Sequence, residues 1–331
     1  MRASRLNLPP PANAGLALQR YLRAHDEQKA AARELIEIIT QTPISPAYKE
    51  AFERWKTALP GAIFLEATTR TPLAIGLGNA SPLENGLTIH HTYAMPYLPG
   101  SALKGLVRRA ADRFGLSPQE KAVLLGEGPD SRKKTQGNAA HLVYWDGWLD
   151  PASAQPFQKD VITVHHQDYY NKRGADDTWP SDFDDPNPVS FLSVKPGVKF
   201  YIALSSSSQL AEVWLHTAAA LLKWGLENLG LGGKTNAGYG YFAVQLPPRP
   251  KSEYEQGLEL LAQYKNRIDR IKPANERGEL NYFLQELRGK PTVLRMPTLE
   301  ALRHHLQEWK VWNPSKNPQH AEIQQLLEEQ S

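Results

Sequence analysis

A glycine-rich turn at residues 229–242, LGLGGKTNAGYGYF, constrains the fold more than any other stretch of the chain. The segment before it, residues 209–230, places apolar side chains at helical spacing, and the segment after it, YGYFAVQL, reads as a strand. Five glycines fall within eleven residues of this turn. Because glycines permit left-handed backbone angles and leave main-chain amides uncovered, the sequence predicts a helix, a loop that a ligand can approach closely, and a strand.

The residue types in this turn favour an anionic ligand. Lys234 supplies a positive charge, and the short side chains after it can donate hydrogen bonds. Uncovered amides and one ammonium group suit a sugar-phosphate backbone. A tight turn that only lets the helix pack closely on the sheet is the alternative. The candidate RNA-binding residues of the turn are Gly232, Gly233, Lys234, Thr235, Asn236 and Tyr239.

Two common phosphate-binding loops do not fit the turn. A Walker A loop runs from a strand into a helix and needs a glycine where this chain has Asn228. Here the helix precedes the loop and the strand follows it. The third glycine of a dinucleotide-binding fingerprint is also missing.

The composition limits the classes of function. With 38 basic and 35 acidic residues the net charge is only +3, so a nucleic-acid site requires local clustering of charge. The absence of cysteine excludes disulfides and thiolate zinc sites and is typical of a reducing compartment. No apolar run approaches the roughly 18 residues of a membrane span, and the N-terminus lacks the apolar region of a signal peptide. We expect a cytoplasmic protein.

Positive charge gathers in residues 100–134, where eight basic residues stand against four acidic ones. The first part of this stretch predicts a helix with a buried apolar stripe and with Ser101 as its N-cap. Lys104 and Arg108 lie one turn apart on a shared face, and Arg109 also lies off the stripe. We add these four residues to the candidate RNA-binding set. A solvated basic face is the alternative.

Residues 150–196 read as a long irregular region, which is unusual inside a compact domain unless it is functional. Between residues 160 and 190, seven aspartates outnumber two basic residues. Because this acidic stretch follows a basic one, we expect either contact with a neighbouring subunit or an internal network of ion pairs.

Three adjacent histidine pairs raise the question of catalysis. Adjacent side chains point apart on a strand or a helix, and no pair has the spacing of zinc or iron ligands. His165 or His91 has the chemistry of a general base for cleavage of RNA at a 2′-hydroxyl, but a hydrogen-bonded structural role explains them as well. We assign no catalytic residue, no metal and no cofactor. The pairs are His90/His91, His165/His166 and His304/His305.

The order of the expected elements gives the fold class. One helix is expected over residues 15–41 and a second from Pro46, followed by a core strand within residues 61–77. The basic helix, a strand at 141–149, the irregular region, a strand at 197–205, the long apolar helix and the last strand complete a βαββαβ order. We predict an α+β, ferredoxin-like (RRM-like) fold.

The expected organisation has three parts. An N-terminal tail and helical extension cover residues 1–58, and the ferredoxin-like RNA-binding core covers 59–246 with an insertion at about 126–196. After a proline-rich linker, residues 247–331 form C-terminal helices that are expected to break at Pro273, Pro291, Pro297, Pro314 and Pro318.

Several of these segments resemble a known protein family. LGLGGKTNAGYGYF resembles the C-terminal glycine-rich loop of the RAMP superfamily, the repeat-associated proteins of CRISPR effector complexes. YLPGSALKGLVRRAA at residues 97–111 is similar to the helix-opening element of the same proteins. DVITVHHQDYYN and FLSVKPGVKFYIAL further resemble the family of the sixth RAMP subunit of the type III-B Cmr complex. The resemblance covers about residues 60–246.

The resemblance implies a ferredoxin-like RAMP domain in a non-catalytic subunit of antiviral defence. Such a subunit binds crRNA near its 3′ end, caps the stack of backbone subunits and presents the guide to a target RNA. Part of the 150–196 insertion would act as a thumb-like element against a neighbour or between bases. The implied partners are crRNA, target RNA, neighbouring RAMP backbone subunits and small helical Cmr subunits, with no membrane. The implied phosphate contacts are Gly232, Gly233, Lys234 and Thr235, with Ser101, Lys104 and Arg108 along the same groove.

Two other functions stay open at this point. One is a metal-independent RNA-processing endonuclease of the RAMP class, with a histidine as its base. The other is a scaffold that contacts only proteins. Salt-dependent RNA binding, or RNA cleavage without metal, would separate the three.

Overall fold

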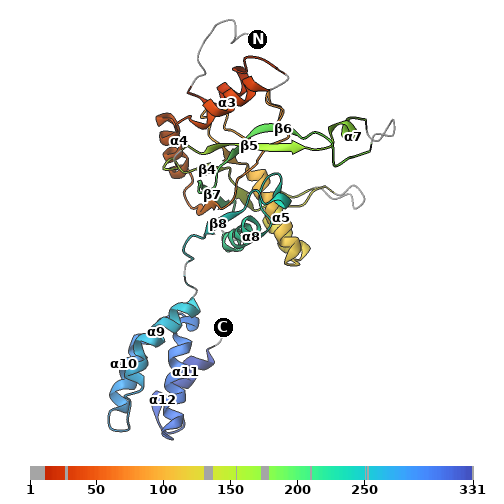
Figure 1. Ribbon diagram of the computed structural model, residues 1–331. Helices are drawn as coiled ribbons and strands as arrows, with labels where there is room; N and C mark the ends of the chain where they lie inside the picture. Colours follow the sequence, from red (N-terminus) through yellow and green to blue (C-terminus); the bar gives the residue numbers. More distant parts are fainter. Residues whose placement is uncertain are drawn as a thin grey trace. The chain divides into compact units, whose positions relative to one another are not determined.

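The computed structural model describes residues 12–26, 29–129, 137–153, 155–172, 179–208, 211–249, 251 and 253–329. The chain divides into two compact units, Met1–Pro247 and Pro248–Ser331. The first unit contains the glycine-rich turn and the basic helix (Figure 1).

An antiparallel sheet forms the centre of the first unit. Its strands follow the order β2-β4-β7-β1-β8, and β3 also pairs with β7. Strand β1 is antiparallel to both β7 and β8, and the helices α5 and α8 precede β4 and β8 in the chain. This arrangement confirms the predicted ferredoxin-like βαββαβ fold. The bounds are β1 Ile63–Thr69, β2 Tyr97–Leu98, α5 Gly100–Arg113, α6 Pro118–Leu125, β3 Leu142–Tyr144, β4 Gly147–Leu149, β7 Lys199–Ser206, α8 Trp214–Asn228 and β8 Phe242–Gln245.

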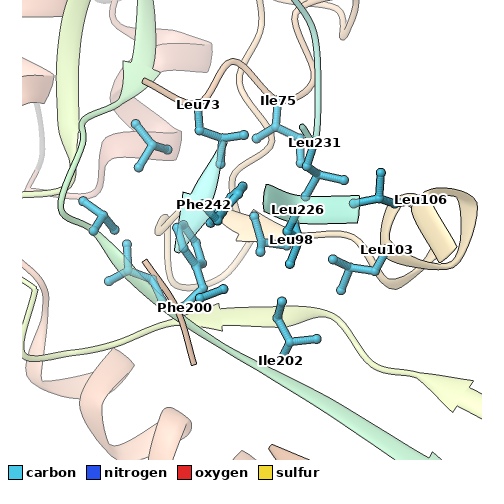
Figure 2. Packing of buried hydrophobic residues seen from close by; sticks show 14 of the residues in the cluster. Leu73, Ile75, Leu98, Leu103, Leu106, Phe200, Ile202, Leu226, Leu231 and Phe242 are labelled. Carbon is cyan, nitrogen blue, oxygen red and sulfur yellow. The ribbon is translucent and has the colours of Figure 1, made fainter. Parts of the chain in front are cut away.

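The hydrophobic core lies between this sheet and the helices α5 and α8. Leu65 of β1 pairs with Ile202 of β7, and both are buried because alternate residues of a strand point to one face. Figure 2 shows Ile202 and Phe200 on the sheet side of this cluster, with Leu103 and Leu106 contributed by α5 and Leu226 by α8. A Cβ added at Gly225 would lie 2.8 Å from Cγ of Leu106, so the glycine lets α8 approach α5 closely.

The helix α4, Pro46–Thr57, packs aromatic side chains on the other face of the sheet. Ser45 caps α4 by accepting a hydrogen bond from the Tyr48 amide. The ring of Trp55 stacks on Trp148 of β4 with centroids 5.5 Å apart, and Phe52 meets Tyr201 of β7 edge-on at 5.5 Å. The Tyr48 hydroxyl donates to the Leu149 carbonyl at 2.8 Å. The N-terminal extension thus completes the packing of the sheet.

The expected single helix over residues 15–41 is wrong. The structure has two helices there, α2 Ala14–Arg20 and α3 Ala30–Thr40. Between them Asp26 accepts a hydrogen bond from the Ala31 amide at 3.2 Å, and Lys29 takes a left-handed backbone angle of φ 54°. A local side-chain acceptor and a left-handed residue both interrupt helical geometry. Helix α3 then packs against the two strands at residues 157–164 and 187–194.

The expectation of an irregular region at 150–196 is also wrong. Strands β5, Phe157–Val164, and β6, Asn187–Val194, pair antiparallel along eight positions. The short helix α7, Gln167–Lys172, lies between them, and the hairpin projects from the first unit with α7 at its far end (Figure 1). The base of the hairpin is buried: Phe157 and Val194 belong to the main core. The insertion predicted from the sequence is therefore an ordered hairpin over much of its length.

The described part of the second unit consists of four helices with their own core. Leu280, Phe283, Leu299 and Ile323 are fully buried in it. Pro297 lies inside α11 without breaking it, so the expected break there is wrong; the buried leucines that follow it hold the helix together. No described helix is long and apolar enough to cross a membrane. The bounds are α9 Glu253–Ile268, α10 Glu276–Leu287, α11 Thr292–Glu308 and α12 Pro318–Glu328.

Candidate nucleic-acid interface

The glycine-rich turn leaves the end of α8 through left-handed backbone angles. Gly230 has φ +72° and donates its amide hydrogen to the Gly225 carbonyl at 3.0 Å, which ends the helix. Gly232, Gly238 and Gly240 also have positive φ, and so does Lys234 at 59°. The sequence prediction of a helix, a left-handed loop and a strand is confirmed.

The inner side of the turn is closed by residues 72–75. Gly233 donates its amide hydrogen to the Ala74 carbonyl at 2.7 Å, and Gly240 donates to the Pro72 carbonyl at 2.8 Å. A Cβ at position 232 would lie 2.6 Å from the Ala74 oxygen. Close packing therefore requires glycine on this side of the turn. The Gly233 amide, which was predicted to face a phosphate, is already used by Ala74.

Several main-chain amides of the turn have no hydrogen-bond acceptor among the described residues. Among the described residues, none accepts a hydrogen bond from the amides of Gly232, Lys234, Thr235 or Asn236. The Lys234 side chain is exposed, and no carboxylate in the described part of the chain pairs with it. Consecutive amides after a left-handed residue form a concavity that binds anions. We call these four amides, together with the exposed Lys234 ammonium group, the cradle.

The tyrosines after the cradle are committed to other contacts. The Tyr239 hydroxyl donates to Oδ2 of Asp160 on β5 at 2.6 Å, and burial together with this carboxylate raises the pKa of Tyr239 to about 12. The Tyr241 hydroxyl donates to the Thr235 carbonyl at 3.3 Å. Tyr239, one of the predicted RNA-binding residues, therefore ties the turn to the hairpin of β5 and β6.

The start of the basic helix differs from the prediction. Helix α5 begins at Gly100, and the amide of Gly100 donates to Oδ1 of Asp146 at 2.7 Å. Ser101 lies inside the first turn and makes no cap, so its predicted role as N-cap is wrong. A carboxylate distant in sequence replaces a local cap because Gly100 packs tightly against the Tyr144 carbonyl.

The basic side chains of α5 are free of ion pairs. Arg108 and Arg109 are exposed and Lys104 is half-buried, and none of the three forms an ion pair with a described residue. The triplet at 132–134 lies outside the described residues. The basic helix therefore keeps its charge available to an anion.

The strand register separates the start of α5 from the glycine-rich turn. Gly100 adjoins Tyr144, which pairs with Leu204, and Leu204 pairs with Ile63 at the first residue of β1. The turn joins β8 beyond Thr69, at the other end of β1. Ile63 and Thr69 are six residues apart on β1. At about 3.3 Å per residue, the start of α5 and the glycine-rich turn therefore lie about 20 Å apart along the strand. A strand of RNA that touches both would have to extend over that length, so their shared groove stays a prediction.

Sequence reasoning missed Arg70 at this end of the sheet. Arg70 follows β1 directly, its side chain is exposed, and its amide donates to the Tyr241 carbonyl at 2.8 Å. It thus flanks the strand into which the turn leads. The sequence did hold a signal for Arg70. In a βαββαβ fold the end of the first strand adjoins the last loop, so a basic residue there lies beside that loop.

Hydrogen bonds fix two of the described histidines, one from each of two adjacent pairs. His90 Nδ1 accepts hydrogen bonds from the amides of Thr92 and Tyr93, and burial lowers the pKa of His90. His166 Nδ1 lies 2.8 Å from Oδ2 of Asp184. No carboxylate among the described residues orients His165 or His91 as a base, and no described group of three acidic or histidine side chains forms a metal site.

Comparison with known proteins identifies the family. Residues 66–243, more than half of the chain, match the RAMP superfamily. The CRISPR system Cmr subunit Cmr6 of Pyrococcus furiosus is 25% identical over 247 residues, which cover 58% of this chain and 72% of that protein. The crystal structure of Cmr6 from Pyrococcus furiosus matches 55% of this chain and 97% of its own at 22% identity and a TM-score of 0.33. A cryo-EM structure of the type III-B Cmr-beta complex bound to cognate target RNA contains a chain that matches 64% of this one and 70% of its own at 21% identity and a TM-score of 0.49. Because the family match runs from β1 through α5 and α8 to the glycine-rich turn, this chain belongs to the RAMP superfamily.

Proposed function

We propose that this protein is a non-catalytic crRNA-binding subunit of a type III-B Cmr ribonucleoprotein. It holds the 3′ part of the guide RNA, caps the backbone of RAMP subunits and supports recognition of a target RNA. Its similarity to a Cmr6 subunit supports the place in the complex. The observation that supports the RNA contact is the cradle, whose amides have no acceptor among the described residues and whose Lys234 pairs with no described carboxylate.

The chemistry of this cradle suits phosphates more than bases. Main-chain amides and an ammonium group recognise the charge and shape of the RNA backbone, and such contacts position a strand without reading its sequence. The tyrosine rings next to the cradle are held by Asp160 and by the main chain, so they are poorly placed to stack on bases. A subunit that must accept any guide needs this kind of recognition.

The experiment measures binding of a guide-like single-stranded RNA over a range of salt concentrations. The slope of log K against log salt is negative, and each lost phosphate contact on a single strand reduces its magnitude by about 0.7. We expect Lys234→Gln to flatten the slope by about this amount and the double variant with Lys104→Gln by about twice as much. Lys316→Gln, an exposed lysine of the second unit, is the matched control and leaves the slope unchanged.

Two results would overturn the proposal. An unchanged slope in the double variant would remove the phosphate cradle. Cleavage of the RNA in the presence of a chelator, abolished by His165→Ala or His91→Ala, would make the protein a metal-independent endonuclease instead.

A further inference from the structure

A cavity lies between α2 and the loop that follows β1. It holds about 390 Å³, which is within the range of about 300–1,000 Å³ that is usual for small-molecule sites. Its lining comes from the start and middle of α2, from residues within 79–91 and from Tyr97 of β2. We call it the α2 cavity. No described residue of the glycine-rich turn or of α5 lines it, so it is separate from the cradle and from the basic helix.

Hydrogen bonds hold both walls of the α2 cavity in place. Oδ1 of Asn13 accepts from the Leu16 amide at 2.8 Å, and Nδ2 of Asn13 donates to the Thr92 carbonyl at 3.4 Å, so α2 is joined to the loop. On the loop side the Thr88 amide donates to the Ile75 carbonyl at 2.8 Å. The cavity is therefore pre-organised, and little conformational entropy is lost when a ligand enters it.

The described lining of the α2 cavity contains no lysine, arginine, aspartate or glutamate. Of the described lining residues, only His90 and His91 can gain a charge near neutral pH. Burial lowers the pKa of His90 from its usual value of about 6.5, so that ring is neutral at neutral pH. A phosphate or an ammonium group in this cavity would lose its water without meeting an opposite charge. The lining therefore favours an uncharged occupant.

The side chains of the α2 cavity suit a flat ring with polar edges. Leu16 is 45% exposed, so an apolar surface of α2 is open to a ring. Nδ1 of His90 accepts from two nearby amides, which leaves the proton of the neutral ring on Nε2, where no described residue accepts it. The Gln19 amide and the Tyr97 hydroxyl have no hydrogen-bond partner among the described residues either. Donors and acceptors beside an apolar wall are the features that recognise a nucleobase.

One residue connects the α2 cavity to the glycine-rich turn. Leu77 packs on the turn, because a Cβ at Gly233 would lie 3.1 Å from Cδ1 of Leu77. The Leu77 carbonyl accepts a hydrogen bond at 3.0 Å from the amide of Gly86, which lines the cavity. The cavity and the turn are thus neighbours on either side of Leu77.

We infer that the α2 cavity holds one nucleobase, splayed out of an RNA strand that crosses the cradle. The face of the base lies against Leu16, and its edge meets Nε2 of His90 and the Gln19 amide. Because a Gln amide both donates and accepts, the cavity does not require one particular base, as a guide of any sequence demands. Single-stranded RNA is commonly recognised through bases that are splayed out in this way. The assignment of the base to RNA rests on the proposed function; the uncharged lining of the cavity does not.

The experiment compares a single-stranded RNA of about six nucleotides with a fully abasic strand of the same length, each bound to the full-length chain. The two strands carry the same phosphates, so only the bases distinguish them. We expect the wild type to bind the RNA about tenfold more tightly than the abasic strand, since one stacked base contributes about this factor or more. The slope of log K against log salt should be equal for the two strands, because the number of phosphate contacts is the same.

Two variants place the effect in the α2 cavity. Ala80 is exposed and lines the cavity, so Ala80→Trp fills it and should abolish the preference for RNA over the abasic strand. Ala30→Trp is the matched control, because Ala30 is an exposed alanine of α3 that is not among the lining residues, and it should keep the tenfold preference. Gln19→Ala, a milder change on the surface of α2, should reduce the preference about threefold. Thermal unfolding checks that each variant is folded.

Four results would overturn the inference. Equal binding of the two strands by the wild type would do so without any variant, and a full preference in folded Ala80→Trp would place the bases elsewhere. A free nucleoside that saturates the cavity while the wild type shows no preference between the strands would assign the cavity to a metabolite. Weaker binding of another protein subunit by Ala80→Trp, with the RNA preference intact, would assign it to an aromatic side chain. Failure of the cradle appears in the salt slope of Lys234→Gln, whereas failure of the cavity appears in the preference for bases.

Discussion

Substituting alanine for Gly240 tests how the cradle is built. Gly240 is buried at φ +76°, its amide donates to the Pro72 carbonyl, and its carbonyl accepts from the Leu231 amide. A Cβ at this position would lie inside contact distance of the Leu231 carbonyl oxygen. Backbone cannot yield locally as a flexible side chain does, so the turn must move and lose both hydrogen bonds.

The cost follows from two contributions. A left-handed angle costs a non-glycine residue about 1–2 kcal/mol. Losing two hydrogen bonds adds about 1 kcal/mol each, so Gly240→Ala should lower the free energy of unfolding by about 3–4 kcal/mol. Gly238→Ala is the matched control, because Gly238 has φ +88° in the same turn and nothing lies near its Cβ position. The control should lower the free energy of unfolding only by the cost of the left-handed angle, about 1–2 kcal/mol.

Urea unfolding followed by tryptophan fluorescence measures both variants. Six of the eight tryptophans lie in residues 1–247, so the signal reports mainly on the first unit. The second unit has its own core, and its transition is fitted separately. Equal destabilisation by the two substitutions would refute the reasoning, since it would mean that the Leu231 carbonyl does not close over Gly240.

Substitutions at three further positions test the surroundings of the site. Asp146→Ala leaves the Gly100 amide without its acceptor and should lower the free energy of unfolding by about 1 kcal/mol, measured with urea. Asp146→Asn keeps an oxygen acceptor and should retain most of that stability. Phe52→Ala removes a buried ring from the sheet face and should cost about 3–5 kcal/mol; a cost near zero would mean that α4 is detached in solution. Burial lowers the pKa of His90, so the folded state binds a proton less readily than the unfolded state. The stability due to neutral His90 should be complete above its usual pKa of about 6.5 and decline as the pH falls below it, and His90→Asn should make the thermal midpoint less dependent on pH between 7 and 5.

Local patterns predicted the parts of the fold that are determined locally. The apolar stripe of α5 and the glycines after α8 each act within a few residues, and both elements appear where the sequence places them. Their order along the chain was enough to predict the βαββαβ fold, because short connections leave few arrangements for such a sequence of elements. The exposed Lys234 followed from the same local pattern.

Features that depend on distant partners were not predicted. The acceptor at the start of α5 is Asp146, 46 residues away in the chain, and nothing near Ser101 indicates it. The pairing of β5 with β6 joins Phe157 to Val194 across an acidic, proline-containing stretch that reads as a loop. The role of Tyr239 could not be predicted because its partner, Asp160, belongs to that unpredicted hairpin. Long-range pairing is specified by packing and not by local propensity.

The packing of α4 explains why the candidate site lies on a loop and not on the sheet. RNA-binding domains with a comparable four-stranded sheet stack bases on aromatic residues of its open face. Here two aromatic residues of that face, Trp148 and Tyr201, are covered by Trp55 and Phe52 of the protein's own helix α4. Because those rings are occupied, they offer bases no platform, which favours the proposed contact with RNA at the end of the sheet, where the glycine-rich turn carries Lys234. A fold that fills its own base-stacking face in this way favours recognition of phosphates, which is the chemistry that a guide of arbitrary sequence requires.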